Sequence, residues 1–548
     1  MSTTFNIYKV KSSRYDELLK KINSVGLKKQ KTKTIENYEL TFFFSDNVKG
    51  NEIWWLKTYV EFLENKDHNK FNIFHYGLLI CQKIEDKDTI FAISLGKSHF
   101  YLNQYIQTNF GIDLAIRMAN EKTTLLKKSR FFAGVKKQEV SSYGKFIKDS
   151  YEAGESVEHI KLKAEDTELW GSKNIIFADS VQLEIDRKPE DLPKLLSKIE
   201  ETIKIKDLKI SLPKIEPALE EINKILDLQI IDSLKTSINN PISIDEFSSN
   251  GVNISFRNND HSYILKYLKT DRKTISSELL NSIESKTISE FIINNNEIDN
   301  INYLKIQFKS EEKGTFTLPI KEIIDSVITY DNDHYFLKNG NWYKFNQTFR
   351  EYLKKSIESI NLEKKIELDD NNYMQWFKEK SRKITANEAT KDDITYREYY
   401  FNDFLSTNHG YDLLDRELEK IKSIDNTLPD YKLEIADLYK DGEIISLKIS
   451  DEKTSLIYNI AQSNSSVEAI KRNLAEFKKE INSAALWFVF EKDINKITEV
   501  NSIQFLLEIE SWKKNVENHG LTPKIYISKL INKCKTPQAP KRPGNKKH

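Results

Sequence analysis

The sequence predicts a multidomain α+β protein with an α/β domain near its C-terminus, ordered helix, three strands, helix, strand. The chain has 548 residues but only 16 glycines and 11 prolines, which favours regular elements over long loops. Segments with strand-type alternation and segments with helical spacing both occur, without a regular strand–helix repeat in the first half. An Asp-Gly turn between two β-branched runs at residues 432–450 is a strong hairpin signal.

The predicted C-terminal domain is organised around this hairpin. The first run presents Asp437, and the second carries Ser446 and Lys448, which lie two positions apart and therefore on one face of a strand. A helix before the hairpin contains Glu398, and a helix after it contains Gln462. The elements follow in the order helix 395–406, strand 411–415, the hairpin, helix 455–481, strand 484–490, helix 503–516 and strand 524–528.

The preceding part of the chain is predicted to be mixed α+β. Its strands are predicted at 5–10, 38–44, 71–81, 89–95, 170–185, 251–256, 303–309 and 315–319, with a hairpin at 335–345. Its helices are predicted at 14–25, 53–63, 109–120, 189–204, 208–234, 275–293 and 348–357.

Composition shifts suggest the domain boundaries. We expect an N-terminal α+β domain over 1–234, a middle α+β region over 235–360, and a charged linker over 361–394. The C-terminal domain spans 395–531. Residues 532–548 form a basic tail with three prolines and no acidic residue, which this composition predicts to be disordered.

Composition also limits the function classes. Lys and Arg number 84 against 83 Asp and Glu, so any nucleic-acid-binding surface must be a local patch. The two cysteines, Cys81 and Cys534, are far apart, which predicts neither a disulfide framework nor a structural zinc site. The sequence has no apolar run long enough for a membrane span and no apolar signal region at its start. We therefore expect a cytoplasmic protein.

Residues 122–137 form a local basic segment interleaved with Phe131 and Phe132. Basic groups beside aromatic rings suit a surface that follows phosphates and stacks on bases. Its candidate nucleic-acid-binding residues are Lys127, Lys128, Arg130, Lys136 and Lys137. The alternative is a solvated loop beside the core, which is the more common origin of a charge run.

The hairpin residues suggest phosphodiester chemistry. A carboxylate on one strand and a lysine on its partner can hold Mg²⁺, assist the formation of hydroxide and stabilise charge on a phosphorane. The region resembles the PD-(D/E)XK restriction-endonuclease-like core, with its α-β-β-β-α-β order. By that resemblance Glu398 is the first-helix glutamate, Asp437 the metal-binding aspartate, Lys448 the motif lysine and Gln462 the glutamine of the following helix. The alternative is an ordinary cross-strand pair in another α/β domain.

The sequence departs from this family at Ser446, where the motif has Glu or Asp. A hydroxyl is a poor replacement for a carboxylate on a hard cation. Glu434 and Glu443 lie nearby, but strand alternation places them on the wrong face unless a bulge intervenes. Glu398 could instead fill the gap from the preceding helix. Whether cleavage is retained stays open at this point.

Other motifs along the chain resemble a sporadically distributed bacterial family of unknown function. They are FAISLGKSHFYL at 91–102, NFGIDLAIRMAN at 109–120, WGSKNIIFADSVQLEID at 170–186, YFLKNGNWYKFN at 335–346 and EIADLYKDGEIISLKI at 434–449. The similarity covers nearly the full length. Patchy distribution is typical of defence genes against phage and other foreign DNA, so this resemblance implies antiphage defence.

Three functions are therefore considered. The first is a Mg²⁺-dependent DNA endonuclease in antiphage defence, with Glu398 and Asp437 as metal ligands, Lys448 activating water and Gln462 orienting the lysine or a phosphate. The second is a catalytically inactive sensor of nucleic acid or of a phage protein. The third is a protein-interaction scaffold, which acidic residues crowding residues 127–137 and Lys448 would favour. DNA is the expected partner, with a homo-oligomer or a defence partner protein as further expectations and no membrane.

Overall fold

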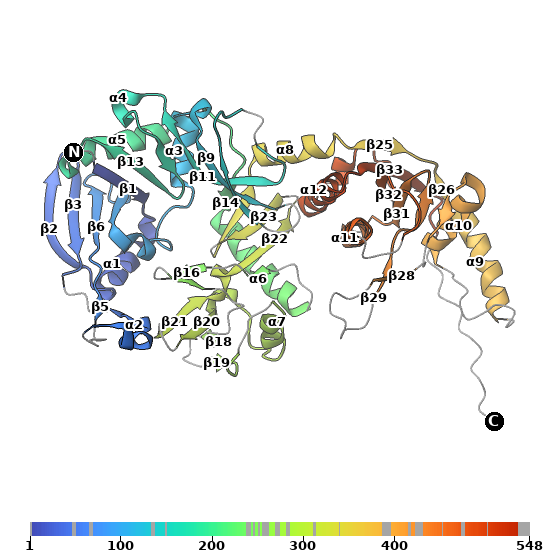
Figure 1. Ribbon diagram of the computed structural model, residues 1–548, viewed down its shortest axis with the longest axis horizontal. Helices are drawn as coiled ribbons and strands as arrows, with labels where there is room; N and C mark the ends of the chain where they lie inside the picture. Colours follow the sequence, from blue (N-terminus) through green and yellow to red (C-terminus); the bar gives the residue numbers. More distant parts are fainter. Residues whose placement is uncertain are drawn as a thin grey trace. The chain divides into compact units, whose positions relative to one another are not determined.

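The structure of the chain is a computed structural model. It describes residues 3–46, 51–64, 70–132, 137–147, 151–236, 243–244, 247–249, 252–254, 262–268, 274–280, 285–310, 314–331, 333–338, 340–385, 396–414, 418–421, 431–451, 453–472, 477–500 and 502–534. The chain divides into two compact units. Unit 1 comprises Met1–Arg130, Gln138–Tyr151 and Glu155–Thr348, and unit 2 comprises Phe131–Lys137, Glu152–Gly154 and Phe349–His548. Helices and strands are mixed in both units (Figure 1), so the predicted α+β class is confirmed.

The N-terminal part of unit 1 is built on a long sheet with the strand order β10-β9-β11-β12-β13-β1-β7-β6-β3-β2. Its strands are β1 (Thr3–Lys9), β2 (Lys28–Ile35), β3 (Tyr38–Phe44), β6 (Gly77–Lys83), β7 (Ile90–Leu95), β9 (Leu126–Phe131), β10 (Lys137–Ser142), β11 (Glu155–Ala164), β12 (Ile175–Phe177) and β13 (Ser180–Ile185). Short elements beside it are β4 (Asn51–Glu52), α2 (Trp54–Thr58), β5 (Phe71–Asn72), β8 (Ala119–Asn120) and α4 (Thr167–Trp170).

Helices α1 (Tyr15–Ser24), α3 (Phe110–Met118) and α5 (Leu192–Ile203) bury their apolar sides in this part of unit 1. In α1, Leu18 and Ile22 are four residues apart and so lie on one face of the helix. Both are fully buried against Val10, Leu78 and Ile80. The alternation of β6 sends Leu78 and Ile80 to the same side of the sheet, which explains why helix and strand share this core.

The rest of unit 1 contains two smaller sheets, with the orders β14-β24-β23-β22-β15 and β19-β18-β20-β21, and the separate pair β16-β17. Their strands are β14 (Ile215–Pro217), β15 (Ser243–Ile244), β16 (Phe247–Ser249), β17 (Val252–Ile254), β18 (Ser262–Leu268), β19 (Thr274–Ser276), β20 (Leu304–Ser310), β21 (Gly314–Pro319), β22 (Ile324–Tyr330), β23 (Asp333–Lys338) and β24 (Asn341–Phe345). Helices α6 (Glu220–Thr236) and α7 (Ser285–Ile293) share one core with them, in which Leu226, Ile230 and Leu234 are buried. The boundary expected between residues 234 and 235 therefore falls beside this shared core.

Several predicted elements differ from the structure. The helix expected over 275–293 is shorter, because residues 274–276 pair with β18 as β19 and α7 begins at Ser285. The strand expected over 170–185 is a hairpin, since β12 and β13 pair through Phe177 and Val181. In both places long-range or turn geometry that a local pattern does not contain decides the outcome.

Unit 2 contains a mixed sheet with the order β25-β33-β32-β31-β30-β27, and β26 also pairs with β33. Its strands are β25 (Asn361–Lys364), β26 (Leu368–Asp369), β27 (Asp412–Leu413), β30 (Leu438–Lys440), β31 (Glu443–Ile449), β32 (Ser483–Phe490) and β33 (Thr522–Ile531), and β28 (Leu418–Ile421) pairs with β29 (Tyr431–Glu434). Its helices are α8 (Gln347–Ile357), which begins at the border of the units, α9 (Asp370–Thr385), α10 (Arg397–His409), α11 (Lys453–Lys471) and α12 (Ile503–Asn518).

The centre of this sheet is buried on both faces. Strands β25, β33, β32 and β31 are parallel, whereas β30 is antiparallel to β31 and β27 to β30. Every residue of β32 is buried, as expected for a parallel strand covered by helices on both sides. Helices α11 and α12 lie on one side of the strands, and α9 and α10 on the other (Figure 1).

The predicted linker over 361–394 contains ordered elements of this unit. Strands β25 and β26 pair with β33, and α9 contributes Tyr373 and Phe377 to the core beside the sheet. The sequence of these short strands is charged and shows no strand pattern. They are strands because they pair with β33, which lies far along the chain. Residues 386–394 of that linker, and 535–548 of the predicted tail, lie outside the described residues. Within the described part of the chain, no helix is long and apolar enough to cross a membrane.

Candidate functional site

The turn between β30 and β31 is determined by its sequence. Asp441 and Gly442 have φ angles of 48° and 82°, as the favoured two-residue hairpin turn requires. A Cβ at position 442 would lie 2.9 Å from the side-chain nitrogen of Asn482, so the side chain of Asn482 would have to shift, but it is the positive φ that favours glycine. The resulting register pairs Leu438 with Ile445.

Asp437 lies directly before β30, where the pairing with β31 ends. Its main-chain N–H donates to the carbonyl oxygen of Ile445 at 3.0 Å. Its Oδ2 accepts a 2.6 Å hydrogen bond from the N–H of Leu447. The carboxylate thus occupies the place that a main-chain carbonyl would take if the ladder continued. The run expected over 432–439 is divided, because β29 pairs with β28 whereas β30 pairs with β31.

Glu398 lies in the first turn of α10 and reaches β31. Its Oε1 and Oε2 lie 2.9 Å and 3.0 Å from Nζ of Lys448. Oε1 also accepts a hydrogen bond from the N–H of Ile449 at 3.2 Å. The side chains of Glu398 and Lys448 are 26% and 24% exposed, so water screens this ion pair less than it screens a pair on the open surface.

Two carboxylates therefore bind alternate N–H groups along one edge of β31. Leu447 and Ile449 are two residues apart, so their N–H groups point the same way and are about 7 Å apart. Asp437 takes one and Glu398 the other, and Lys448 lies between them in the sequence. The structure thus brings the three predicted residues to the C-terminal end of β31, the end at which parallel strands of open α/β sheets commonly bind ligands.

The structure does not join Ser446 and Gln462 to these three in the same way. Ser446 is 7% exposed, and its carbonyl oxygen accepts a 3.4 Å hydrogen bond from Nδ2 of Asn459 in α11. Gln462 lies one helical turn further along α11 and is partly exposed. Among the described residues, no hydrogen bond links its side-chain amide to Lys448 or Glu398. Sequence reasoning missed Asn459, although its position three residues before Gln462 places both on neighbouring parts of the helix.

The donor set limits which metal could bind. Among the described residues, no group of three or more His, Cys, Asp or Glu side chains is placed to hold a metal ion. Asp437 and Glu398 provide two carboxylates, and Lys448 contacts both oxygens of Glu398. Mg²⁺ commonly binds through one or two carboxylates and takes its other ligands from water and substrate phosphates. A Mg²⁺ ion at this end of β31 would have at most two protein carboxylates, and it would take its other ligands from water and a phosphate.

The middle of the predicted basic segment, residues 126–131, is strand β9. Nζ of Lys127 lies 2.5 Å from Oε1 of Glu155, and both side chains are almost fully buried. Arg130 pairs with Glu158 at 3.0 Å, while Lys128 is partly exposed. These acidic partners compensate the charges of Lys127 and Arg130, so neither is displayed on an open basic surface.

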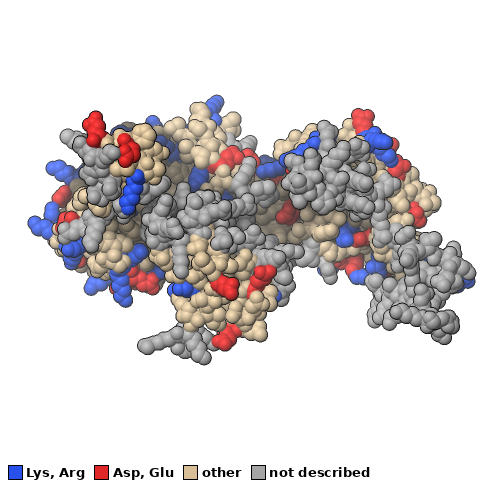
Figure 2. All heavy atoms as spheres, turned by 60° about the horizontal axis from the view of Figure 1, so that its bottom comes forward, with Lys and Arg blue, Asp and Glu red and all other residues tan. Residues whose placement is uncertain are grey.

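Of the remaining candidate nucleic-acid-binding residues, Lys136 and the side chain of Lys137 lie outside the described residues. On the face of the molecule in Figure 2, basic and acidic side chains are interspersed.

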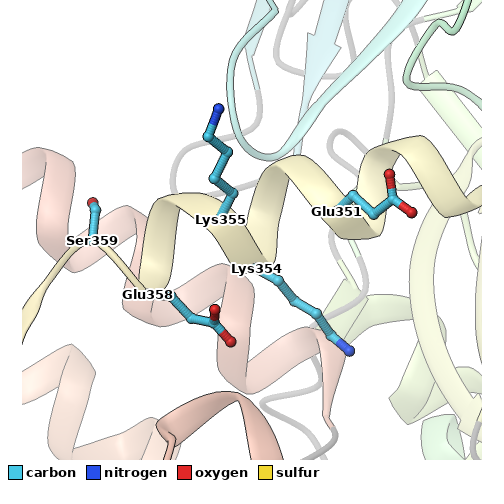
Figure 3. Close-up of a pocket in the computed structure, with 5 residues that line it drawn as sticks. All are labelled: Glu351, Lys354, Lys355, Glu358 and Ser359. Atoms are coloured by element: carbon cyan, nitrogen blue, oxygen red, sulfur yellow. The ribbon is translucent and has the colours of Figure 1, made fainter.

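A hollow of about 500 Å³ lies along α8 and its C-terminal end (Figure 3). It is lined by Glu351, Lys354, Lys355, Glu358 and Ser359. Lys354 and Glu358 project from one side of the helix and Lys355 from the other (Figure 3). All five residues come from one short stretch of chain, and the four charged ones are two glutamates and two lysines, so the hollow lacks the convergent groups of an active site.

Comparison with protein families assigns the chain. The model of a family of unknown function, DUF6119, matches residues 5–512. The chain belongs to the DUF6119 family. The DUF6119 match includes Glu398, Asp437, Lys448 and Gln462 and ends within α12. The resemblance to a family of unknown function is thus confirmed over most of the chain. Comparisons with curated proteins and with solved structures find no significant match.

Proposed function

We propose that this protein acts on foreign DNA in antiphage defence, as a Mg²⁺-dependent endonuclease with a PD-(D/E)XK-like domain in unit 2. The order of elements supports the proposal. Helix α10, strands β27, β30 and β31, helix α11 and strand β32 follow one another, with the pair β28-β29 inserted before β30. Their strands are adjacent in the order β32-β31-β30-β27, with β31 parallel to β32. This order of elements is compatible with the α-β-β-β-α-β order of the resembled core and so supports the proposal.

The observation that carries the proposal is that Asp437 binds the N–H of Leu447 at the end of β31, while Glu398 binds the N–H of Ile449 and pairs with Lys448. Two carboxylates and one ammonium are the groups that metal-assisted phosphodiester hydrolysis needs. They come from a loop, a helix and a strand, so the fold alone brings them together. Glu398 is fixed through Ile449, and Asp437 through Leu447, which holds both carboxylates in place without a substrate.

The roles follow from the contacts. Asp437 and Glu398 would hold Mg²⁺, which when bound supplies positive charge to a phosphate and lowers the pKa of its water. Lys448 exchanges its contact with Glu398 for one with a phosphate oxygen or the attacking water. As a compact cation on a flexible stem, it can make this exchange without movement of β31.

A specific observation favours a second candidate, a catalytically inactive sensor of nucleic acid or of a phage protein. Ser446 occupies the position of the motif acid and is buried, so the site has one carboxylate fewer. This sensor retains the fold and uses the end of β31 for binding. Lys127, Arg130 and Lys448 are each paired with a glutamate, which is the acidic crowding that favours the remaining alternative, a protein-interaction scaffold.

One experiment separates these functions. Plasmid DNA is incubated with the wild type, Asp437→Ala and Asp441→Asn, each with Mg²⁺ and with a chelator, and the same samples are run in gel-shift assays at several salt concentrations. Asp441→Asn is the matched control, because it removes a carboxylate from the same hairpin but keeps a turn sequence that tolerates positive φ.

The outcomes are distinct. If the protein is an endonuclease, the wild type and Asp441→Asn cleave plasmid DNA in the presence of Mg²⁺, whereas Asp437→Ala does not. A nucleic-acid sensor shifts DNA without product, and its affinity falls steeply with salt. Equal cleavage by Asp437→Ala would end the assignment of this site, and the absence of both cleavage and binding would leave only a protein-interaction role.

A further inference from the structure

Asp370 is the first residue of α9, and its side chain is fully buried. Its Oδ1 accepts a 2.7 Å hydrogen bond from Nε of Arg397, and its Oδ2 accepts a 2.9 Å hydrogen bond from Nη2 of Arg397. The N–H of Cys534 donates to Oδ2 at 2.8 Å. A buried carboxylate needs this many partners, because an uncompensated charge in the interior is very unfavourable.

Arg397 is held from three directions. Besides the two-pronged pair with Asp370, its Nη2 donates to the carbonyl oxygen of Cys534 at 3.2 Å. Its guanidinium also lies over the ring of Tyr373, 5.2 Å from the ring centre. A planar guanidinium bound by a carboxylate fork and an aromatic face has little rotational freedom. The start of α10 is therefore fixed relative to α9 and to the end of β33.

Among the residues that the structure describes, no side chain caps the N-terminus of α10. Tyr396 is the N-cap residue, and no side-chain hydrogen bond caps the helix there. Uncapped first turns fray, because their N–H groups lack intrahelical partners. Arg397 and Glu398 are neighbours in this turn, so whatever fixes Arg397 also fixes the direction of Glu398.

We infer that Asp370 is a positioning residue that acts through Arg397 to hold Glu398 against Lys448 and Ile449. Its importance for catalysis rests on the proposed function, but the positioning itself does not. The alternative is an ion pair that only stabilises the fold. Buried ion pairs are weak evidence for stability, so a measurement at the position of Glu398 is needed to distinguish the two.

The main-chain N–H groups of β31 provide that measurement. The N–H of Ile449 donates to Glu398, whereas the N–H of Leu447 donates to Asp437. Amide hydrogen exchange at single-residue resolution is measured on the full chain, as wild type and as Asp370→Asn. We expect exchange at Ile449 to become about tenfold faster, with exchange at Leu447 unchanged.

Asp369→Asn is the matched control variant. Asp369 neighbours Asp370, but its Oδ1 accepts from the N–H of Asn371 and from Nδ2 of Asn532 instead of from Arg397. We expect no change at Ile449 in this variant. If Asp370→Asn accelerates amide exchange equally at Ile449 and Leu447, or accelerates it at neither residue, the inference is overturned.

Two further variants keep the inference testable if Asp370→Asn does not fold. Arg397→Lys keeps the positive charge but loses the two-pronged hydrogen bonding to Asp370. It should therefore accelerate amide exchange at Ile449 selectively, and by a smaller factor than Asp370→Asn. Tyr396→Ser introduces a cap at an extended N-cap position, and it should restore protection of Ile449 when combined with Arg397→Lys. Failure of both expectations overturns the inference.

Cleavage assays then test the functional part separately. If the protein cleaves DNA, Asp370→Asn should reduce the cleavage rate at least tenfold without a change in DNA binding. A protein that never cleaves, yet shows the selective change at Ile449, retains the positioning role and loses the proposed function. Full cleavage by Asp370→Asn with unchanged exchange at Ile449 removes the positioning role alone.

Discussion

The hydroxyl of Tyr526 donates a 2.5 Å hydrogen bond to Oε1 of the buried Glu443, across the intervening strand β32. Oε2 of the same carboxylate accepts from Ser483 at 2.8 Å and pairs with Lys524 at 2.7 Å. These contacts join the beginnings of β31, β32 and β33. Burial and the contact with Glu443 raise the pKa of Tyr526, which keeps its hydroxyl protonated and able to donate.

Glu443→Gln should therefore destabilise unit 2 by about 1–3 kcal/mol, because an amide cannot accept from all three partners. The measurement is urea unfolding of the variant and the wild type. Asp441→Asn, an exposed position two residues earlier in the chain, is the control and should leave the midpoint unchanged. An unaltered midpoint for Glu443→Gln would show that the network adds nothing to stability.

Glu508 predicts a dependence of stability on pH. Burial in α12 raises the pKa of its carboxyl above the ordinary range. The folded state thus favours the protonated form of Glu508. The stability gained from this preference is fully present below the unfolded pKa of about 4.3, and it is lost as the pH rises through the folded pKa. Glu508→Gln should raise the unfolding temperature at pH 7, and the gain should shrink towards pH 4.

Thermal unfolding between pH 4 and pH 8 checks this prediction. Glu517→Gln is the control, since Glu517 lies on the same helix and is exposed. A gain from Glu508→Gln that does not vary with pH would contradict the assignment of the effect to the partly buried carboxyl of Glu508.

Gly111 predicts a steric limit in unit 1. A Cβ at this position would meet the carbonyl oxygen of Ser180 and, at 2.8 Å, the main-chain nitrogen and oxygen of Ala178. All these atoms belong to the backbone, so they cannot move aside as a flexible side chain can. Gly111→Ala should destabilise unit 1 by about 2–3 kcal/mol. Gly144→Ala is the control, because a Cβ at position 144 meets no atom within 4 Å. The unfolding temperature of Gly111→Ala should therefore lie clearly below that of Gly144→Ala.

Local sequence contains the information for the hairpin but not for the charge partners. Asp441 and Gly442 specify a turn that few other residue pairs form, and the turn together with strand alternation places Lys448 relative to Asp437. Lys127, in contrast, looks exposed in the sequence, because its partner Glu155 lies on another strand of the sheet. The α+β class and the family of unknown function could thus be predicted, whereas the burial of Lys127 and Arg130 could not.

The same reasoning explains the missed elements of unit 2. Strand β25 has only four residues and is stabilised by parallel pairing with β33, so its own sequence carries little strand signal. Asp370 and Arg397 lie in stretches that look like charged linker and helix start, and their pairing depends on how α9 and α10 meet. Long-range contacts of this kind leave no periodic pattern in a single sequence.

Ser446 provides a test by gain of function. Ser446→Asp would add a third carboxylate beside Asp437 and Glu398, as the motif of the resembled nucleases has it. Without a divalent ion, a third buried negative charge should lower stability by about 1–3 kcal/mol. Mg²⁺ should then raise the unfolding temperature of the variant more than that of the wild type, because an ion that binds the folded state stabilises it by mass action.

The control for this variant is Ser446→Asn, which has the same shape as Ser446→Asp but no charge. Its unfolding temperature should respond to Mg²⁺ only as the wild type does. If added plasmid is also cleaved faster by Ser446→Asp, the end of β31 is a nuclease site that lacks one ligand. If Mg²⁺ raises the unfolding temperatures of Ser446→Asp and Ser446→Asn equally, the carboxylates of Asp437 and Glu398 do not face the position of Ser446. The assignment of a metal to them must then be given up.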